Sequence, residues 1–147
     1  MPAADVPAVG VLDASVAVKV VVPETGTAES VSLLETTVHW LAPRLMILEV
    51  ASALRRMVEA GRLDALAAAA ALAATLDAVA DGIIVLADDE ALAPAALNLA
   101  LTVNHKVPDC VYLALAEREG AFLASADRRL LGLARTRGID VAVVPSA

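Results

Sequence analysis

The sequence predicts a three-layer α/β/α sandwich with a central parallel sheet of four to five strands. Hydrophobic residues make up 59% of the 147 residues and aromatic residues only 2%, so the core is built mainly from Val, Leu, Ile and Ala. Continuous apolar runs are typical of strands buried on both faces. They alternate with longer segments of helical periodicity, which indicates a parallel sheet between helical layers. The runs lie at residues 9–13, 83–86, 121–124 and 141–144.

Between the first two runs, a helical hairpin is expected. Pro43 fits the first turn of a helix that runs to Ala60, with Gly61 as its stop. Asp64 then caps an alanine-rich helix that reaches about Ala80.

Two further helices are expected after the run at residues 83–86. The acidic residues 88–90 open a helical stretch, in which Pro94 marks a fresh helix start or a kink. Pro108 begins the next helix, which continues through Glu119. The expected order is therefore strand, helices, strand, helices, strand, helix, strand, in a single domain over residues 1–147.

The composition argues against a membrane protein despite a mean hydropathy of +0.73. The longest stretch without a formal charge, from Ala91 to the residue before Lys106, has 15 residues, whereas a membrane span needs about 20. No basic residue precedes Lys19, so the chain lacks the positive start of a secretory signal. We expect a cytoplasmic protein without a membrane segment.

Any metal bound by this chain must be held by oxygen atoms. The single Cys110 excludes an internal disulfide and a multi-cysteine zinc site, and His39 and His105 lack a metal-binding spacing. The net charge of −7 argues against broad electrostatic wrapping of nucleic acid but permits a local basic patch. The strongest basic cluster is Arg128, Arg129, Arg135 and Arg137, which is also what a solvated helix face would look like.

Two acids follow predicted strands. Asp13 comes directly after the first strand and Asp127 three residues after the third. Ligands bind at the carboxyl ends of strands in open parallel sheets, so both acids are expected to face the same crevice. Asp127 also fits a purely structural role as N-cap of a helix that begins at Arg128, with Ser125 as the rival cap.

Two more acids lie on predicted helices. Glu49 borders the apolar arc of the helix that ends at Ala60, and its structural alternative is a boundary carboxylate stabilised by Arg56. Asp109 lies in the first turn of the next-to-last helix, where an acid can simply compensate the helix dipole. Together, the four acids offer oxygen ligands for Mg²⁺ or Mn²⁺. Such ions activate a water and hold a phosphodiester in line, without a histidine base or a covalent nucleophile.

Four segments in this order resemble the PIN-domain family, and most closely the VapC-type bacterial toxins. The resemblance runs from about residue 9 to residue 144. The segments are VLDAS at 11–15, LEVASALRR at 48–56, PDCVYLALA at 108–116 and LASADRRL at 123–130.

This resemblance implies a metal-dependent endoribonuclease that forms the toxin of a toxin–antitoxin pair. The family's acidic tetrad matches Asp13, Glu49, Asp109 and Asp127. The resemblance therefore implies catalytic and metal-binding roles for these four residues. Ser125 and Ser15 match supporting hydroxyl positions. The resemblance also implies a homodimer, an RNA substrate and a small cognate antitoxin.

With that resemblance in view, Arg128 and Arg129 are candidates for holding the RNA backbone beside the metals. Trp40 and Tyr112 are interpreted as core residues. His39 and His105 are interpreted as ordinary loop or strand-end residues.

Two other functions remain open from the sequence. The first is a catalytically silent binding module, in which partner binding is the function. The second is a phosphotransfer enzyme with Asp13 as a covalent nucleophile. Against it, Ser15 stands where a second aspartate is expected, and no lysine follows the later strands near a site.

Overall fold

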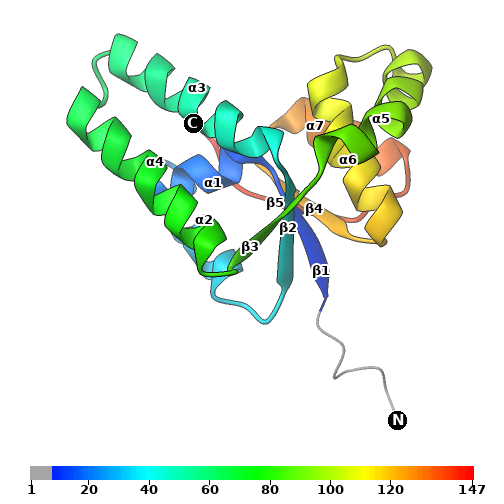
Figure 1. Ribbon diagram of the computed structural model, residues 1–147, viewed down its shortest axis with the longest axis horizontal. Coiled ribbons are helices and arrows are strands. Elements are labelled where there is room, and N and C mark those ends of the chain that lie inside the picture. The colour runs from blue at the N-terminus through cyan, green and yellow to red at the C-terminus, as the bar shows by residue number, and fades with distance from the viewer. Residues whose placement is uncertain (1–7) are drawn as a thin grey trace.

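The computed structural model describes residues 8–147, and five strands and seven helices are found in that part of the chain (Figure 1). In order they are β1 (Val9–Leu12), α1 (Ala14–Val21), α2 (Thr27–Leu34), β2 (His39–Pro43), α3 (Leu45–Glu59), α4 (Ala65–Ala80), β3 (Ile84–Ala87), α5 (Asp89–Val103), α6 (Val107–Glu119), β4 (Phe122–Ser125), α7 (Arg128–Thr136) and β5 (Val141–Val143).

The five strands form one parallel sheet in the order β3-β2-β1-β4-β5. Helices α1 to α4 lie on one side of the sheet and α5 to α7 on the other (Figure 1). The predicted three-layer sandwich with a parallel sheet is therefore confirmed. The chain leaves β1 towards β2 and leaves β4 towards β5, so the connections diverge between β1 and β4. That divergence makes the carboxyl ends of β1 and β4 the expected place for a binding crevice.

The centre of the sheet is packed around a glycine. Gly10 of β1 lies opposite Trp40 of β2 on one side and Phe122 of β4 on the other. The two aromatic rings meet edge to face, with their centroids 5.5 Å apart. A Cβ atom at position 10 would lie 2.7 Å from both rings, so the absence of a side chain allows this contact. Helix α6 packs on β1, β2 and β4 and is buried over residues 109–116.

Several predicted elements are confirmed. The Asp64 carboxylate accepts a hydrogen bond of 2.7 Å from the backbone N–H of Ala67 and so caps α4, which ends at Ala80. Helices α3 and α4 pack against each other as the predicted hairpin. Pro108 lies in the first turn of α6.

The prediction for Pro43 is wrong, and of the two alternatives for Pro94, a fresh helix start or a kink, the first is excluded. Pro43 does not begin a helix; it is the last residue of β2, opposite Ala87, and α3 begins at Leu45. A proline is tolerated there because the end of a strand does not require its missing N–H. Pro94 does not start a new helix, since α5 is one helix that continues through it.

None of the helices between residues 8 and 147 is long and apolar enough to span a membrane. The expectation that no secretory signal is present depends in part on residues 1–7, which lie outside the described residues.

Candidate active site

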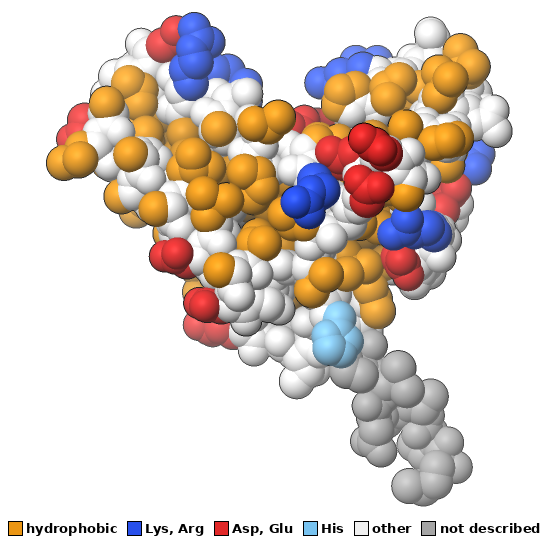
Figure 2. Space-filling view, viewed as in Figure 1, with side chains coloured by type: hydrophobic (Ala, Val, Ile, Leu, Met, Phe, Trp, Pro, Cys, Tyr) orange, Lys and Arg blue, Asp and Glu red, His pale blue; other side chains and the backbone are white. Residues whose placement is uncertain are grey.

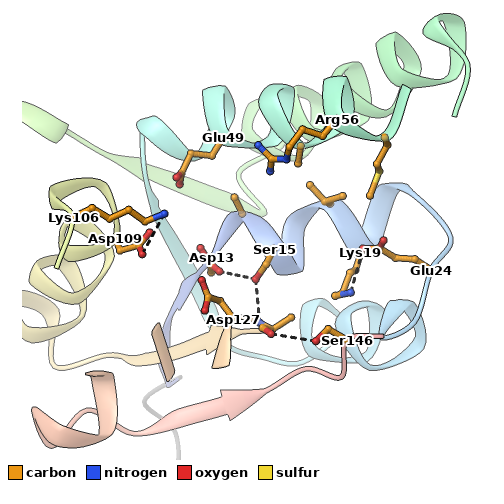
Figure 3. Close-up of a pocket in the computed structure, with 15 residues that line it drawn as sticks. Asp13, Ser15, Lys19, Glu24, Glu49, Arg56, Lys106, Asp109, Asp127 and Ser146 are labelled. Carbon is orange, nitrogen blue, oxygen red and sulfur yellow. Dashed lines mark hydrogen bonds and ion pairs between the residues drawn. The ribbon is translucent and has the colours of Figure 1, made fainter. Parts of the chain in front are cut away.

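A cavity of about 360 Å³ lies where α1, α3 and α6 approach the loop after β4, and all four predicted acids line it (Figure 3). Asp13 follows β1, Glu49 comes from α3, Asp109 from α6, and Asp127 precedes α7. The structure therefore brings together four carboxylates that are far apart in the sequence. Lys106 and Arg56 line the same cavity.

Asp13 is the most enclosed of the four acids and is held by two serines. Its side chain Oδ2 accepts hydrogen bonds from Ser15 Oγ at 2.6 Å and from Ser125 Oγ at 2.8 Å. Each serine oxygen also accepts a backbone N–H, from Ala126 and Asp127 respectively, which leaves the hydroxyl proton for Asp13. Burial raises the pKa of Asp13; the serine hydrogen bonds oppose that rise, and the charges of Asp127 and Asp109 add to it.

Glu49 is held by a residue from another helix. The Tyr112 hydroxyl donates a hydrogen bond of 2.5 Å to Glu49 Oε1. Burial raises the pKa of Glu49; the hydrogen bond from Tyr112 lowers it, and Asp13 and Asp109 raise it further. Arg56, the partner expected from the sequence, makes no ion pair with Glu49 among the contacts of residues 8–147.

Asp109 has two basic neighbours that the sequence analysis did not assign to the site. His105 Nε2 lies 2.6 Å from Asp109 Oδ2, and the His105 side chain is only 5% exposed. Lys106 Nζ lies 3.7 Å from the same oxygen. The interpretation of His105 as an ordinary loop residue was therefore wrong. In the sequence, the position of His105 and Lys106 just before the helix that carries Asp109 was the signal that could have placed them at the site.

Asp127 caps helix α7, as considered from the sequence, and also lines the cavity. Its Oδ1 accepts hydrogen bonds from the backbone N–H groups of Arg129 at 2.9 Å and Leu130 at 3.2 Å, which caps α7. The side chain lines the cavity with the other three acids. A helix cap and a ligand position are therefore compatible here, because each uses a different carboxylate oxygen.

The four acids share one feature of their contacts. In the described part of the chain, every hydrogen bond or ion pair to their side chains reaches a single oxygen of each carboxylate. The second oxygen of each acid has no partner among residues 8–147. One oxygen therefore fixes the side chain, and the other remains available to a ligand.

The carboxylates do not form a closed metal cage as they stand. Within residues 8–147, no group of three or more His, Cys, Asp or Glu side chains is close enough to hold an ion. The donor set nevertheless suits a hard divalent cation, which prefers carboxylate oxygens and keeps several of its own waters. Burial first, and then the neighbouring carboxylates, raise the pKa values of Asp13 and Glu49, and a cation bound in the cavity would favour their charged forms.

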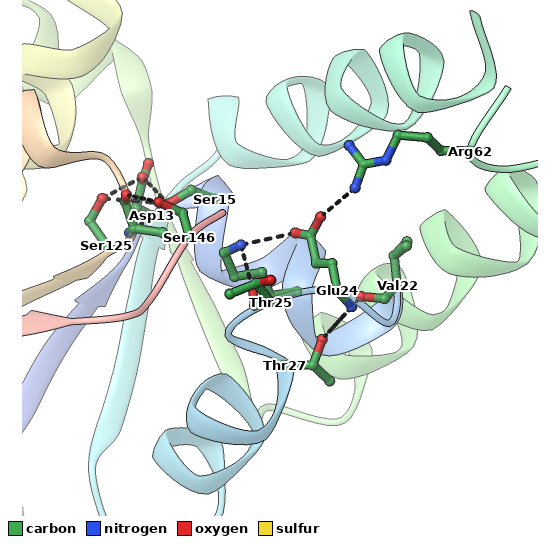
Figure 4. A network of polar contacts seen from close by, with 11 residues as sticks. Asp13, Ser15, Val22, Glu24, Thr25, Thr27, Arg62, Ser125 and Ser146 are labelled. Carbon is green, nitrogen blue, oxygen red and sulfur yellow. Dashed lines mark hydrogen bonds and ion pairs between the residues drawn. The ribbon is translucent and has the colours of Figure 1, made fainter. Parts of the chain in front are cut away.

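Lys19 and Glu24 lie at the end of the cavity away from Asp109 (Figure 3) and belong to a second polar network (Figure 4). Lys19 is 6% exposed and donates to Glu24 Oε1 at 3.2 Å and to the Thr25 carbonyl at 2.7 Å. Arg62 pairs with the other oxygen of Glu24 at 3.2 Å. This network joins α1 to the loop between α3 and α4, so we assign it a structural role.

The two candidate RNA-binding arginines lie at the start of α7. Arg128 and Arg129 are both exposed, and neither lines the cavity of the four acids.

Comparison with known proteins places the sequence in a family. A family model described as the PIN domain matches residues 10–136. No curated protein sequence matches the chain. Among solved structures, the chain is similar to PAE2754 from Pyrobaculum aerophilum, with 24% identity, a TM-score of 0.66, and coverage of 91% of this chain and 83% of that one. That likeness supports the fold alone.

A second similar structure is a member of the VapBC family of toxin–antitoxin systems, VapBC-5 from Mycobacterium tuberculosis. Its identity is 20% and its TM-score 0.49, over 95% of this chain and all of that one (100%).

Proposed function

This chain belongs to the PIN-domain family, and on that premise we propose that it is a divalent-metal-dependent endoribonuclease that cleaves RNA phosphodiester bonds. PIN domains are generally nucleases. The observation that carries the proposal is the cavity lined by four carboxylates, each with one oxygen held by the protein and one without a partner. Scaffolding alone does not account for four acids arranged in this way, because crowded carboxylates repel one another.

Mg²⁺ fits this donor set, and Mn²⁺ is the alternative. Asp13, Glu49, Asp109 and Asp127 would hold it through their second oxygens. When bound, such an ion lowers the pKa of a water and stabilises the charge that develops on the leaving oxygen.

The neighbouring side chains keep the acids in place for this role. Ser15 and Ser125 orient Asp13, and Tyr112 orients Glu49. His105 holds one oxygen of Asp109. Contacts of this kind fix ligand orientation, and losing one typically costs about 10- to 100-fold in metal affinity or activity.

The decisive experiment is to sequence RNA ends after brief induction of the protein beside its Asp13→Asn variant. Discrete new ends confined to the active protein would support the proposal and give both substrate and cut site. Identical RNA ends in the two cultures would refute it.

We also propose that the chain is the toxin of a toxin–antitoxin pair that acts in the cytoplasm. Support comes from the resemblance of its motifs to VapC-type toxins and from an apolar groove of about 500 Å³ between α1, α2 and α4. Apolar side chains are also exposed over the arm formed by α3 and α4 (Figure 2). A groove of this kind suits the apolar face of a partner segment. Induction without a partner should slow growth, and normal growth beside detectable RNA cleavage would argue against toxicity.

A homodimer completes the proposed assembly. Large apolar side chains are exposed on α3 and α5, namely Leu48 at 74%, Leu97 at 53% and Leu101 at 74%. Exposed apolar surface of this kind marks interaction sites. Light scattering of the isolated protein should give twice the chain mass of 15.0 kDa, whereas the single-chain mass at all concentrations would exclude the dimer.

A further inference from the structure

A second polar cavity, of about 440 Å³, lies beside the acidic one. Its lining consists of Asn104, His105, Lys106 and Arg129. It contains no carboxylate, although the chain as a whole carries a net charge of −7. This hollow therefore differs in charge from the neighbouring acidic cavity.

Lys106 connects the two cavities. It lines both of them, and its ammonium group lies 3.7 Å from Asp109 at the acidic site. Its side chain is 68% exposed, so the group is accessible to a ligand in solution. A polyanion bound beside Asp109 would therefore contact Lys106 and extend from there into the second cavity.

Arg129 supplies the second cation, and the structure distinguishes it from its neighbour. Arg129 lines this cavity, whereas Arg128 lines none of the cavities described for residues 8–147. Among the ion pairs of those residues, none involves Arg129, so its guanidinium charge is not neutralised by a carboxylate. Asn104 adds an amide group that can donate to an anion.

We propose that this second cavity binds an internal backbone phosphate of the RNA, adjacent to the phosphate at the four acids, through Arg129, Lys106 and Asn104. The inference rests on the proposed nuclease function and deepens it, because it gives the direction in which the strand leaves the cleavage site. It also assigns the RNA contact to Arg129 and not to Arg128. Two cations and an amide around one hollow match the charge and the acceptor oxygens of a phosphodiester.

The test compares two adjacent arginines in an Asp13→Asn background, so that bound RNA is not cut. Fluorescence anisotropy with a short labelled single-stranded RNA is measured over a range of salt concentrations. Arg129→Ala should weaken binding by about tenfold and reduce the slope of log affinity against log salt by about 0.7, the value for one phosphate contact. Arg128→Ala, the matched control, should leave both quantities unchanged.

Two further measurements test whether Arg129 contacts an internal phosphate. Arg129→Lys should keep the salt slope but recover only part of the affinity, because lysine lacks the planar fork of donors. The effect of Arg129→Ala should be the same with a 5′-hydroxyl and a 5′-phosphorylated RNA. An effect seen only with the 5′-phosphate would overturn the assignment to an internal phosphate.

Equal losses in the two alanine variants, or no loss in Arg129→Ala, would overturn the proposal, as would a parent protein that fails to bind RNA at low salt. The nuclease proposal is judged separately, from cleavage by the unmodified protein. RNA binding that depends on Arg129, without any cleavage, would support this phosphate subsite and refute the nuclease proposal.

Discussion

The serine hydroxyls beside Asp13 explain how a buried acid keeps a defined orientation. Ser15 and Ser125 each accept a backbone N–H, and both hydroxyls therefore donate to the same carboxylate oxygen. Their hydrogen bonds favour the charged form of Asp13 but do not outweigh burial, so its pKa remains raised. The protein thus holds an acid whose charge is incompletely compensated, and that is the condition under which a cation binds well.

Asp13→Asn is expected to stabilise the metal-free protein at neutral pH. Because the folded pKa of Asp13 lies above its ordinary value of 3.8, the folded state binds a proton more readily than the unfolded state, and stability is lost as pH rises through the raised pKa. Asp13→Asn has no titrating group at this position and therefore does not lose stability in this way. In chelator at pH 7 it should melt several degrees higher than the wild type, since 1 kcal/mol corresponds to about 4 °C in a domain of this size.

The difference in melting temperature should shrink as the pH falls and vanish below about pH 4, where Asp13 is neutral in both states. The same variant should lose RNA cleavage by about a thousandfold or more. An Asp13→Asn protein that is less stable than the wild type at pH 7 would show that its charge is already compensated without metal.

Tyr112→Phe is expected to lower activity while the fold is kept. The hydroxyl donates to Glu49 and lowers the pKa of that acid, so its loss leaves the pKa of Glu49 higher. The carboxylate then stays protonated up to a higher pH, and the acidic limb of the pH–rate profile should move upward. At pH 7 cleavage should fall by about 10- to 100-fold. A uniform loss at all pH values, with no displacement of that limb, would contradict this role.

The four acids could be predicted from the sequence, but the residues that hold them could not. Asp13 and Asp127 were recognisable because they follow apolar strands, Glu49 because it borders the apolar arc of its helix, and Asp109 because it lies in the first turn of a helix. Tyr112 lies in an apolar run and is fully buried, which is all that the sequence pattern indicates. Its hydroxyl reaches a glutamate 63 positions away, and only the tertiary fold, which brings side chains of α3 and α6 to one cavity, determines that contact.

Among the elements, β2 was the strand that sequence patterns did not predict. It has only three apolar residues before Pro43, and it begins with the exposed His39. What makes it a strand is pairing on both sides, with β1 and with β3. The runs for β1, β3, β4 and β5 were identifiable because they are continuous and apolar. Tertiary context overrides weak local preference in short strands of this kind.

Gly10→Ala is expected to destabilise the sheet without changing the cavity of the four acids. The added methyl would lie 2.7 Å from both Phe122 and Trp40, and these rings are in edge-to-face contact across β1. Overpacking of this kind costs about 1–3 kcal/mol. Urea unfolding should show the loss. Gly132→Ala is the matched control, because a Cβ there meets nothing within 4 Å; equal destabilisation in both would contradict the packing argument.

On the scale of the whole molecule, the divergence of the chain between β1 and β4 assembles the site. It places the residues after both strands, Asp13 and Asp127, at the same edge of the sheet. Helices from the two opposite layers then add Glu49 and Asp109 (Figures 1 and 3). The cavity thus connects the two helical layers, so a cation held by all four acids would link them and stabilise the whole fold.

Mg²⁺ or Mn²⁺ is therefore expected to raise the melting temperature, and by more at higher pH. Binding to the folded state alone contributes about 2.7 kcal/mol at 100 times the dissociation constant. Protons compete with the ion for Asp13 and Glu49, whose pKa values are raised, so the metal-induced shift should grow as the pH rises above the ordinary carboxyl pKa values. Scanning calorimetry with metal and with chelator measures it at each pH.

Asp109→Asn should reduce the metal-induced shift, whereas Asp77→Asn, at an exposed acid of α4 outside the cavity, should leave it unchanged. The comparison separates specific binding from general screening of a protein with a net charge of −7, because screening is insensitive to which acid is removed. A shift that is the same in both variants and constant with pH would exclude the four acids as the metal ligands.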